Sequence, residues 1–223
     1  MRTYFAECAK RVLFLGVFLL PISAQADPVR LYESAQPGPT GEQHSFGLAI
    51  FEGQFVGVRF RLPVEVTTTQ IGGRFGGPGS IFGAVVQLTS KYDFPDSIDL
   101  STRDVLGATV LDLSMPAAEF TANLAVSLQP GWYALVFGAG LFGATGSGAF
   151  AVNNLLVAPI PAFVQSGGIS YPSPPRDYSG IRDIRVFVDG ELTPAPEPGS
   201  LLLVGSGLVA WAVRRRASPQ PRR

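Results

Sequence analysis

The sequence contains only one cysteine and one histidine in 223 residues, and this scarcity excludes several kinds of chemistry. Cys8 precedes the first apolar run, so the residues after that run have no disulfide and no thiol nucleophile. One histidine without further cysteines cannot complete a typical zinc site. His44 has no sequence-marked nucleophile or orienting acid, and no serine lies in a nucleophile elbow. We therefore expect no catalytic residues and place His44 at the surface or at a strand edge.

The sequence also lacks an excess of basic residues where a nucleic-acid-binding surface would need one. The total of 17 basic and 17 acidic residues hides an uneven distribution. Three basic residues lie before Val12 and five follow Val213, which leaves nine basic and sixteen acidic residues between Asp27 and Pro198. The net charge of that region is −7, which disfavours nucleic-acid binding and bulk attraction to anionic polysaccharide.

A long helical period is absent as well, and the central region shows a β pattern instead. Apolar residues recur at every second position of Phe120–Leu128, which indicates a strand with one buried face. Gln129-Pro130-Gly131 then predicts a turn and a hairpin with Trp132–Phe137. A single helical turn fits only at Asp99–Leu106. The other predicted strands, separated by glycine and proline clusters, are Ser45–Phe51, Gln54–Leu62, Val66–Phe75, Ile81–Leu88, Val105–Leu113 and Ile184–Leu192.

The number and spacing of these strands predict an all-β fold. We expect an antiparallel β-sandwich with a jelly-roll-like arrangement, and a barrel is the alternative. Residues 27–193 form this domain, which is long enough to bury about two-thirds of its unfolded surface.

The N-terminal residues 1–26 have the pattern of a secretory signal peptide. Arg2, Lys10 and Arg11 precede the apolar run Val12–Leu20, and Ala24-Gln25-Ala26 is a small-x-small cleavage site. We expect export through the secretion machinery and cleavage by signal peptidase before Asp27.

The C-terminal residues 194–223 combine a proline-rich motif, an apolar run and a basic end. The run Leu201–Val213 carries no charge, and its thirteen residues span about 20 Å as a helix against a hydrocarbon core of roughly 30 Å. Arg214, Arg215 and Arg216 favour the cytoplasmic side. The sequence predicts a flanking hydrophobic helix that is a minimal membrane span.

The order of Pro196-Glu197-Pro198, Gly199-Ser200, the apolar run and the arginines resembles the PEP-CTERM sorting signal of Gram-negative bacteria. The resemblance implies an exosortase-type protease as a partner, with transient membrane anchoring before release to the cell surface or extracellular matrix. A plain C-terminal anchor is the alternative, and the basic end argues against a lipid-anchor signal. Gln54–Leu62 and Gly131–Gly146 also look like the anonymous β-sandwich domains found beside such anchors.

Two sets of residues in the domain are candidates for ligand binding. Asp93, Asp96 and Asp99 offer hard oxygen ligands for a structural calcium ion, although Lys91 and Arg103 can pair with them instead and aspartates also start turns. Trp132, Tyr171 and Tyr178 could form a stacking platform for sugars. Strand alternation puts Tyr133 in the core and Trp132 on the outer face, where it can also simply cover a neighbouring strand.

Two further sequence patterns resemble a nucleotide-binding motif and a catalytic acid pair, but their context disfavours both functions. Gly138–Gly143 satisfies the letters of a dinucleotide-binding motif, but no helical pattern follows it, so we expect an irregular loop. Glu52 and Glu65 lie at opposite ends of a predicted strand, which disfavours a glycosidase-type acid pair. The sequence therefore favours a non-enzymatic exported surface or matrix protein without a required cofactor, associated with exopolysaccharide or biofilm. The alternative is a carbohydrate-binding or glycan-processing module with the same address.

Overall fold

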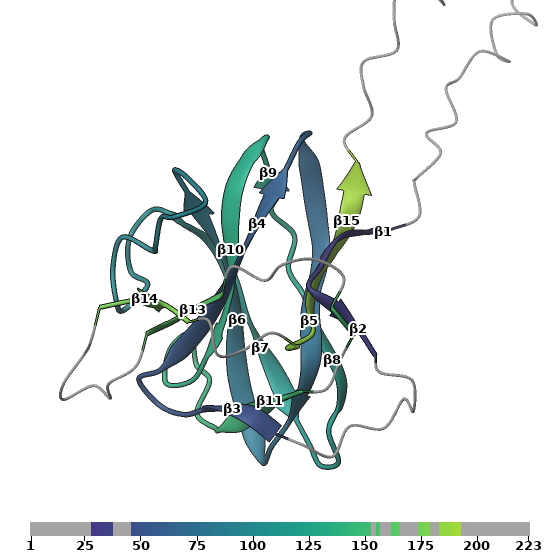
Figure 1. Cartoon of the computed structure of the whole chain (residues 1–223), viewed down its shortest axis with the longest axis vertical. Coiled ribbons are helices and arrows are strands. Elements are labelled where there is room, and N and C mark those ends of the chain that lie inside the picture. The colour runs from purple at the N-terminus through teal and green to yellow at the C-terminus, as the bar shows by residue number, and fades with distance from the viewer. Residues whose placement is uncertain are drawn as a thin grey trace, which may run out of the picture.

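The computed structural model describes residues 28–37, 46–152, 155–156, 162–165, 174–178 and 183–192. These residues form two antiparallel sheets packed face to face (Figure 1). In the seven-stranded sheet the order is β1 (Val29–Glu33), β15 (Val186–Leu192), β5 (Val66–Gly76), β11 (Gly148–Ala151) and β3 (Phe46–Ile50), with β8 (Ala118–Asn123) and β9 (Ser127–Leu128) also paired to β5.

The six-stranded sheet holds most of the apolar strands. Its order is β14 (Arg176–Asp177), β13 (Ala162–Gln165), β4 (Phe55–Leu62), β10 (Gly131–Gly138), β6 (Gly79–Leu88) and β7 (Val105–Leu113). A third, two-stranded sheet joins β12 (Leu155–Leu156) to β2 (Ala35–Gln36). The all-β sandwich predicted from the sequence is confirmed in place of a single closed barrel, while the finer jelly-roll arrangement stays a prediction.

The main core lies between the two sheets and is rich in aromatic rings. Phe75 packs against Phe137 and Phe150, with ring centroids 4.8 and 5.0 Å apart. Tyr133, Leu135 and Phe137 all point into this core, as the alternation predicted. Burying each such side chain stabilises the fold by about 1.5–3 kcal/mol relative to exposure.

Tyr133 also fixes the connection that precedes its strand. Its hydroxyl donates to the carbonyl oxygen of Gln129 at 2.6 Å, a local bond of the kind found in tyrosine corners. Burial raises the pKa of Tyr133 above its ordinary value, so the hydroxyl stays protonated and keeps donating near neutral pH.

A second apolar cluster covers the outer face of the six-stranded sheet. Its fully or nearly buried members are Phe55, Phe82, Ala84, Val86, Leu88, Leu100, Ala134, Val136, Ala144 and Phe163. The strands β4, β6 and β10 are therefore buried on both faces. This explains why they appear in the sequence as nearly continuous apolar runs rather than as alternating patterns.

The predicted hairpin of Phe120–Leu128 with Trp132–Phe137 is wrong. β8 and β9 pair with β5 in the seven-stranded sheet, whereas β10 pairs with β4 and β6 in the other sheet. The turn at Gln129-Pro130-Gly131 therefore carries the chain from one sheet to the other. A proline–glycine turn fixes where the chain reverses, but it does not determine whether the following strand pairs with the preceding one.

The predicted continuous strand Phe120–Leu128 is interrupted between β8 and β9. The buried Thr68 occupies the gap: its hydroxyl donates to the Leu124 carbonyl at 2.5 Å and accepts from the Val126 N–H at 3.0 Å. Leu124 and Leu128 remain buried while their neighbours are exposed, so the predicted alternation is confirmed. Asp99–Leu106 forms turns and the start of β7 rather than a helical turn.

Candidate functional site

The two ends of the described domain leave the sandwich side by side. β1 and β15 are antiparallel neighbours, with Val29 opposite Gly190, and Leu192 lies opposite Val66 at the start of β5 (Figure 1). The tail-side end of the sandwich is defined here by Val29, Leu192 and the β4–β5 turn at residues 63–65. Because β5 has eleven residues, the far end of the sandwich lies about 33 Å away, at Gly76.

The predicted targeting residues lie outside the described residues. They are the leader 1–26 with Cys8, the motif Pro196-Glu197-Pro198, the apolar run 201–213 and Arg214, Arg215 and Arg216. His44, which we expected at the surface or at a strand edge, also lies outside the described residues. In the part of the chain that the structure describes, no helix is long and apolar enough to cross a membrane.

The aromatic candidates do not form one surface. Trp132 is half-buried on the outer face of the six-stranded sheet and packs against the second apolar cluster, which matches its alternative role of covering neighbouring strands. Tyr178 is half-buried and packs against the main core on the other side of that sheet. Tyr171 lies outside the described residues. Among the described aromatic side chains, the most exposed is Tyr92 at 71%, with the Lys91 ammonium 4.7 Å from its ring centroid.

Two of the three aspartates of the calcium hypothesis, Asp93 and Asp99, accept hydrogen bonds through their carboxylates within the 89–104 loop. Asp93 accepts from the Thr89 hydroxyl at 2.6 Å and from the Thr89 and Phe94 N–H groups. Asp99 accepts from the Ser101 hydroxyl at 2.8 Å, while the N–H of Asp96 donates to Asp104. Hydrogen bonds from Thr89 and Ser101, respectively, lower the pKa values of Asp93 and Asp99.

The structure does not bring these carboxylates together as a ligand set. Among the described residues, no three His, Cys, Asp or Glu side chains are grouped so that they could hold a metal ion. Calcium binding by Asp93, Asp96 and Asp99 stays a prediction with a direct test. If calcium stabilises this loop, EDTA will lower the melting temperature of the mature protein.

A buried arginine that the sequence did not single out lies under the same loop. Arg59 on β4 is 3% exposed, and its guanidinium lies 4.5 and 4.8 Å from the ring centroids of Phe94 and Phe163. It donates to the Asp93 carbonyl and to the Asp177 carboxylate, both at 2.7 Å. Arg59 thus ties β4 to the 89–104 loop and to β14. The sequence signal that could have identified Arg59 is an arginine within the otherwise apolar run of β4.

The outer face of the seven-stranded sheet is covered by ion pairs instead of apolar side chains. Arg185 pairs with Glu33 and Glu119, and Arg30 pairs with Glu33 and Asp189. The buried ring of Phe187 lies under both guanidiniums, 3.7 Å from that of Arg30 and 5.0 Å from that of Arg185. The ion pairs join β1, β8 and the β15 segment, and Gln70 on β5 also donates to Asp189, so the polar network extends over four strands.

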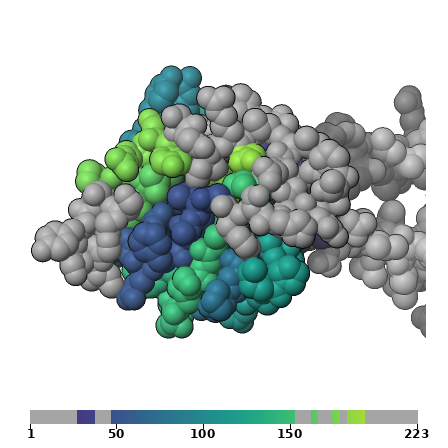
Figure 2. Space-filling view, turned by 60° about the horizontal axis from the view of Figure 1, so that its bottom comes forward, coloured from purple at the N-terminus to yellow at the C-terminus, as the bar shows by residue number. Residues whose placement is uncertain are grey.

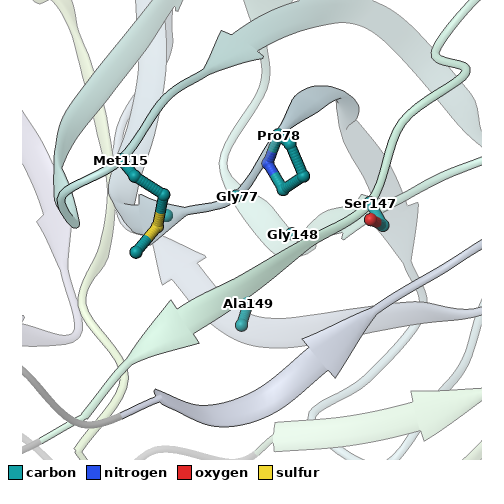
Figure 3. A pocket seen from close by; sticks show the side chains of 7 residues that line it. Gly77, Pro78, Met115, Ser147, Gly148 and Ala149 are labelled. Carbon is teal, nitrogen blue, oxygen red and sulfur yellow. The ribbon is translucent and has the colours of Figure 1, made fainter.

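The far end of the sandwich has a shallow hollow of about 200 Å³, lined by Gly76, Gly77, Pro78, Met115, Ser147, Gly148 and Ala149 (Figure 3). Met115 and Pro78 project from its rim, and Met115 is 60% exposed. Figure 2 shows this end of the molecule, where the segments near residue 50 and near residue 145 lie side by side. The lining has no charged side chain and offers shape rather than acid–base chemistry.

The remaining sequence motifs have structural explanations. No helix follows Gly138–Gly143, and the chain returns through a loop to β11, so the predicted irregular loop is confirmed. Gly140 has φ +86°, and a Cβ there would lie 2.7 Å from the Glu52 side chain. Glu52 and Glu65 are both exposed and lie before β4 and β5, at opposite ends of the sandwich. They do not face each other across a cleft.

The described residues define an all-β sandwich whose two chain ends leave at one end. Residues 194–216 match the family described as the PEP-CTERM protein-sorting motif. The chain thus carries a PEP-CTERM sorting motif in its C-terminal region, as the resemblance of those residues predicted. The motif implies export and targeting to an exosortase-type protease. No curated protein matches the chain.

Proposed function

We propose that this protein is a non-enzymatic component of the cell surface or extracellular matrix, associated with exopolysaccharide or biofilm. The sorting motif at residues 194–216 carries the proposal, because it gives the protein an extracellular address. In this proposal the apolar run 201–213 anchors the protein in the membrane transiently, and cleavage near the motif then releases the sandwich.

The distribution of polar side chains supports a structural role. The buried charged side chains Arg59 and Arg185 are both held in ion pairs that join separate strands and loops. The carboxylates of Asp93 and Asp99 in the 89–104 loop accept from local backbone and hydroxyl groups. A sandwich organised in this way holds its shape without disulfides, which suits a matrix protein that must persist outside the cell.

Mass spectrometry of the mature C-terminus tests the address. In a host that contains an exosortase, we expect a C-terminus near Pro196–Gly199, and Glu197→Ala should leave the tail uncleaved. The matched control is Glu191→Ala, a carboxylate at the end of β15 that lies outside the motif. An intact Arg223 in the wild-type protein would contradict processing and favour the permanent anchor.

A carbohydrate-binding module with the same address is the second candidate, because Trp132 is only half-buried on the outer face of the six-stranded sheet. Tyr92 adds a second, more exposed ring that the sequence did not single out. Glycan-array binding by the mature protein would favour this candidate if Trp132→Ala or Tyr92→Ala removed it. Glycan processing would further require two facing carboxylates, and Glu52 and Glu65 do not provide them.

A further inference from the structure

We propose that the tail-side end of the sandwich docks onto the lipid surface while the protein is anchored. The docking surface is the tail-side patch, which consists of Val29, Val64 and Leu192. These side chains are 45%, 48% and 54% exposed, although they are aliphatic. The inference rests on the proposed membrane anchoring by residues 201–213.

The strand register places the three side chains at one end. Val29 is opposite Gly190, two residues before Leu192 on the same strand. Leu192 is opposite Val66, and Val64 lies two residues before Val66 in the β4–β5 turn. The patch therefore surrounds the point at which the chain leaves the sandwich towards its C-terminus.

Chain length favours one end of the sandwich for contact with the membrane. Eight residues, Thr193–Ser200, separate the last residue of β15 from the apolar run, and they reach at most about 30 Å when fully extended. The far end lies about 33 Å beyond the tail-side end. Even fully extended, the tether only about equals the length of the sandwich, so the far end could approach the same membrane only if the tether were stretched straight along the domain, whereas the tail-side end meets the membrane without such stretching.

The predicted leader imposes the same orientation during export. Eight residues, Pro21–Pro28, separate its apolar run from Val29, and β1 begins beside the end of β15. Both tethers therefore hold the same end close to the bilayer until the leader is removed. The two short connections come from opposite ends of the sequence, and both favour the orientation in which the tail-side end faces the membrane.

A small patch is sufficient because the tether raises its effective concentration at the membrane. Three partly exposed aliphatic side chains would bind a vesicle only weakly as a free protein, but a short tether converts the contact into an intramolecular one. The exposed Tyr92 and Lys91 lie on the loop that leaves β6 after Leu88, towards the same end. An amphipathic ring with a neighbouring lysine suits the headgroup region.

The far end provides the matched control. Phe51, Met115 and Phe142 are also exposed, at 48%, 60% and 42%, but they lie beyond the reach of the bilayer in this orientation. A contact driven by exposed apolar area alone would favour these larger side chains. A contact determined by the tether selects Val29, Val64 and Leu192. Probes at the two ends therefore distinguish the two explanations.

The test uses the full chain reconstituted in vesicles of phosphatidylethanolamine and phosphatidylglycerol, in a Cys8→Ser background. An environment-sensitive fluorophore is attached to Val64→Cys or to Met115→Cys, and spin-labelled lipid is the quencher. We expect a blue shift and loss of most of the fluorescence at position 64, with no change at position 115. Equal quenching at both positions, or none at position 64, would overturn the proposal. A blue shift at 64 without lipid quenching would overturn it in favour of contact with a second protein copy.

A second variant separates docking from anchoring. With the fluorophore on Val29→Cys, the added pair Val64→Asp and Leu192→Asp should abolish quenching while the protein still floats with the vesicles. Met115→Asp should leave quenching unchanged. Unchanged quenching in the double variant would overturn docking and leave the anchor intact. Failure of the parent protein to float would overturn the proposed anchor and docking together.

Discussion

The two sheets cover their outer faces in opposite ways. On the seven-stranded sheet, the ring of Phe187 lies under the guanidiniums of Arg30 and Arg185, which are paired with carboxylates. On the six-stranded sheet, the ring of Phe163 lies beside Arg59 within a second apolar cluster. Each sheet thus combines a buried phenylalanine with arginine, but one surrounds them with charges and the other with apolar side chains.

Both faces depend on a glycine beneath the phenylalanine ring. A Cβ on Gly57 would lie 2.1 Å from the Phe163 ring, and a Cβ on Gly72 would lie 2.6 Å from the Phe187 ring. The missing side chain lets each ring lie close to its sheet. The difference between the faces therefore comes from the residues around the ring. A β-sandwich can therefore carry a second apolar core on the outer face of one sheet and an ion-pair cover on the outer face of the other.

The largest change in stability is expected when a ring is removed from the second apolar cluster, and it tests whether this cluster acts as a core. Phe82 is fully buried on the outer face and packs against Phe142 with centroids 5.2 Å apart. We expect Phe82→Ala to lower the free energy of unfolding by about 3–5 kcal/mol, as for a truncation in a main core. Urea unfolding measures the change.

The control for this experiment lies on the exposed side of the other sheet. Thr121→Ala on β8 should change the stability by less than about 0.5 kcal/mol. A loss below about 1 kcal/mol for Phe82→Ala would mean that the second cluster is a loose cover rather than a core.

The next largest effect concerns Arg59, the buried cation beside the second apolar cluster. Arg59→Ala removes an ion pair, a bond to the loop backbone and ring packing, and we expect a loss of about 2–4 kcal/mol. Arg59→Met keeps most of the volume and removes the buried charge, so its loss should be less than half as large. Equal losses for Ala and Met would show that the charge, rather than the packing, holds the 89–104 loop.

Much of the fold could be predicted from the sequence because burial leaves a periodic signature. The alternation at Phe120–Leu128 predicted one exposed face, and it is found even though Thr68 interrupts the strand. The apolar runs predicted β4, β6 and β10. The strands β1, β2, β11, β12, β13 and β14 escaped prediction, and all of them except β1 have only two to four residues, which are too few to show a period.

The pairing of strands could not be predicted from local pattern. Gln129-Pro130-Gly131 predicts a reversal whether the next strand joins the same sheet or the opposite one. The ion-pair cover was also hidden, because Arg30 and Asp189 are 159 residues apart in the sequence. The tail is the opposite case: its function as an address depends on the local order of residues, so sequence alone was sufficient.

Removing a charge from the ion-pair cover should have a smaller effect than the two changes above. Arg185 is buried, but its partner Glu119 is 44% exposed at the side chain, so solvent screens part of the attraction. We expect Arg185→Met to lower the free energy of unfolding by about 1–2 kcal/mol, and 1 M salt should narrow the gap. Arg61→Met, at an exposed position on β4, is the control and should change little. A loss as large as that of Phe82→Ala would contradict the distinction between the two covers.

The smallest expected effect is a pH dependence of stability that comes from Asp93, in the loop beside the second apolar cluster. Hydrogen bonds from Thr89 hold the pKa of Asp93 below its ordinary value, so ionised Asp93 stabilises the folded loop above the unfolded pKa of about 4. This contribution is lost as the pH falls through the lower, folded pKa. Wild type should therefore be more stable than Asp93→Asn at pH 6, and the difference should shrink as the pH falls below the unfolded pKa of about 4 and through the lower, folded pKa. Urea midpoints across this range measure the difference, and Thr89→Ala should reduce it by removing the hydroxyl donor. Parallel curves for wild type and Asp93→Asn would show that the carboxylate does not hold the loop, and that Arg59 bonds to a backbone that is fixed by packing alone.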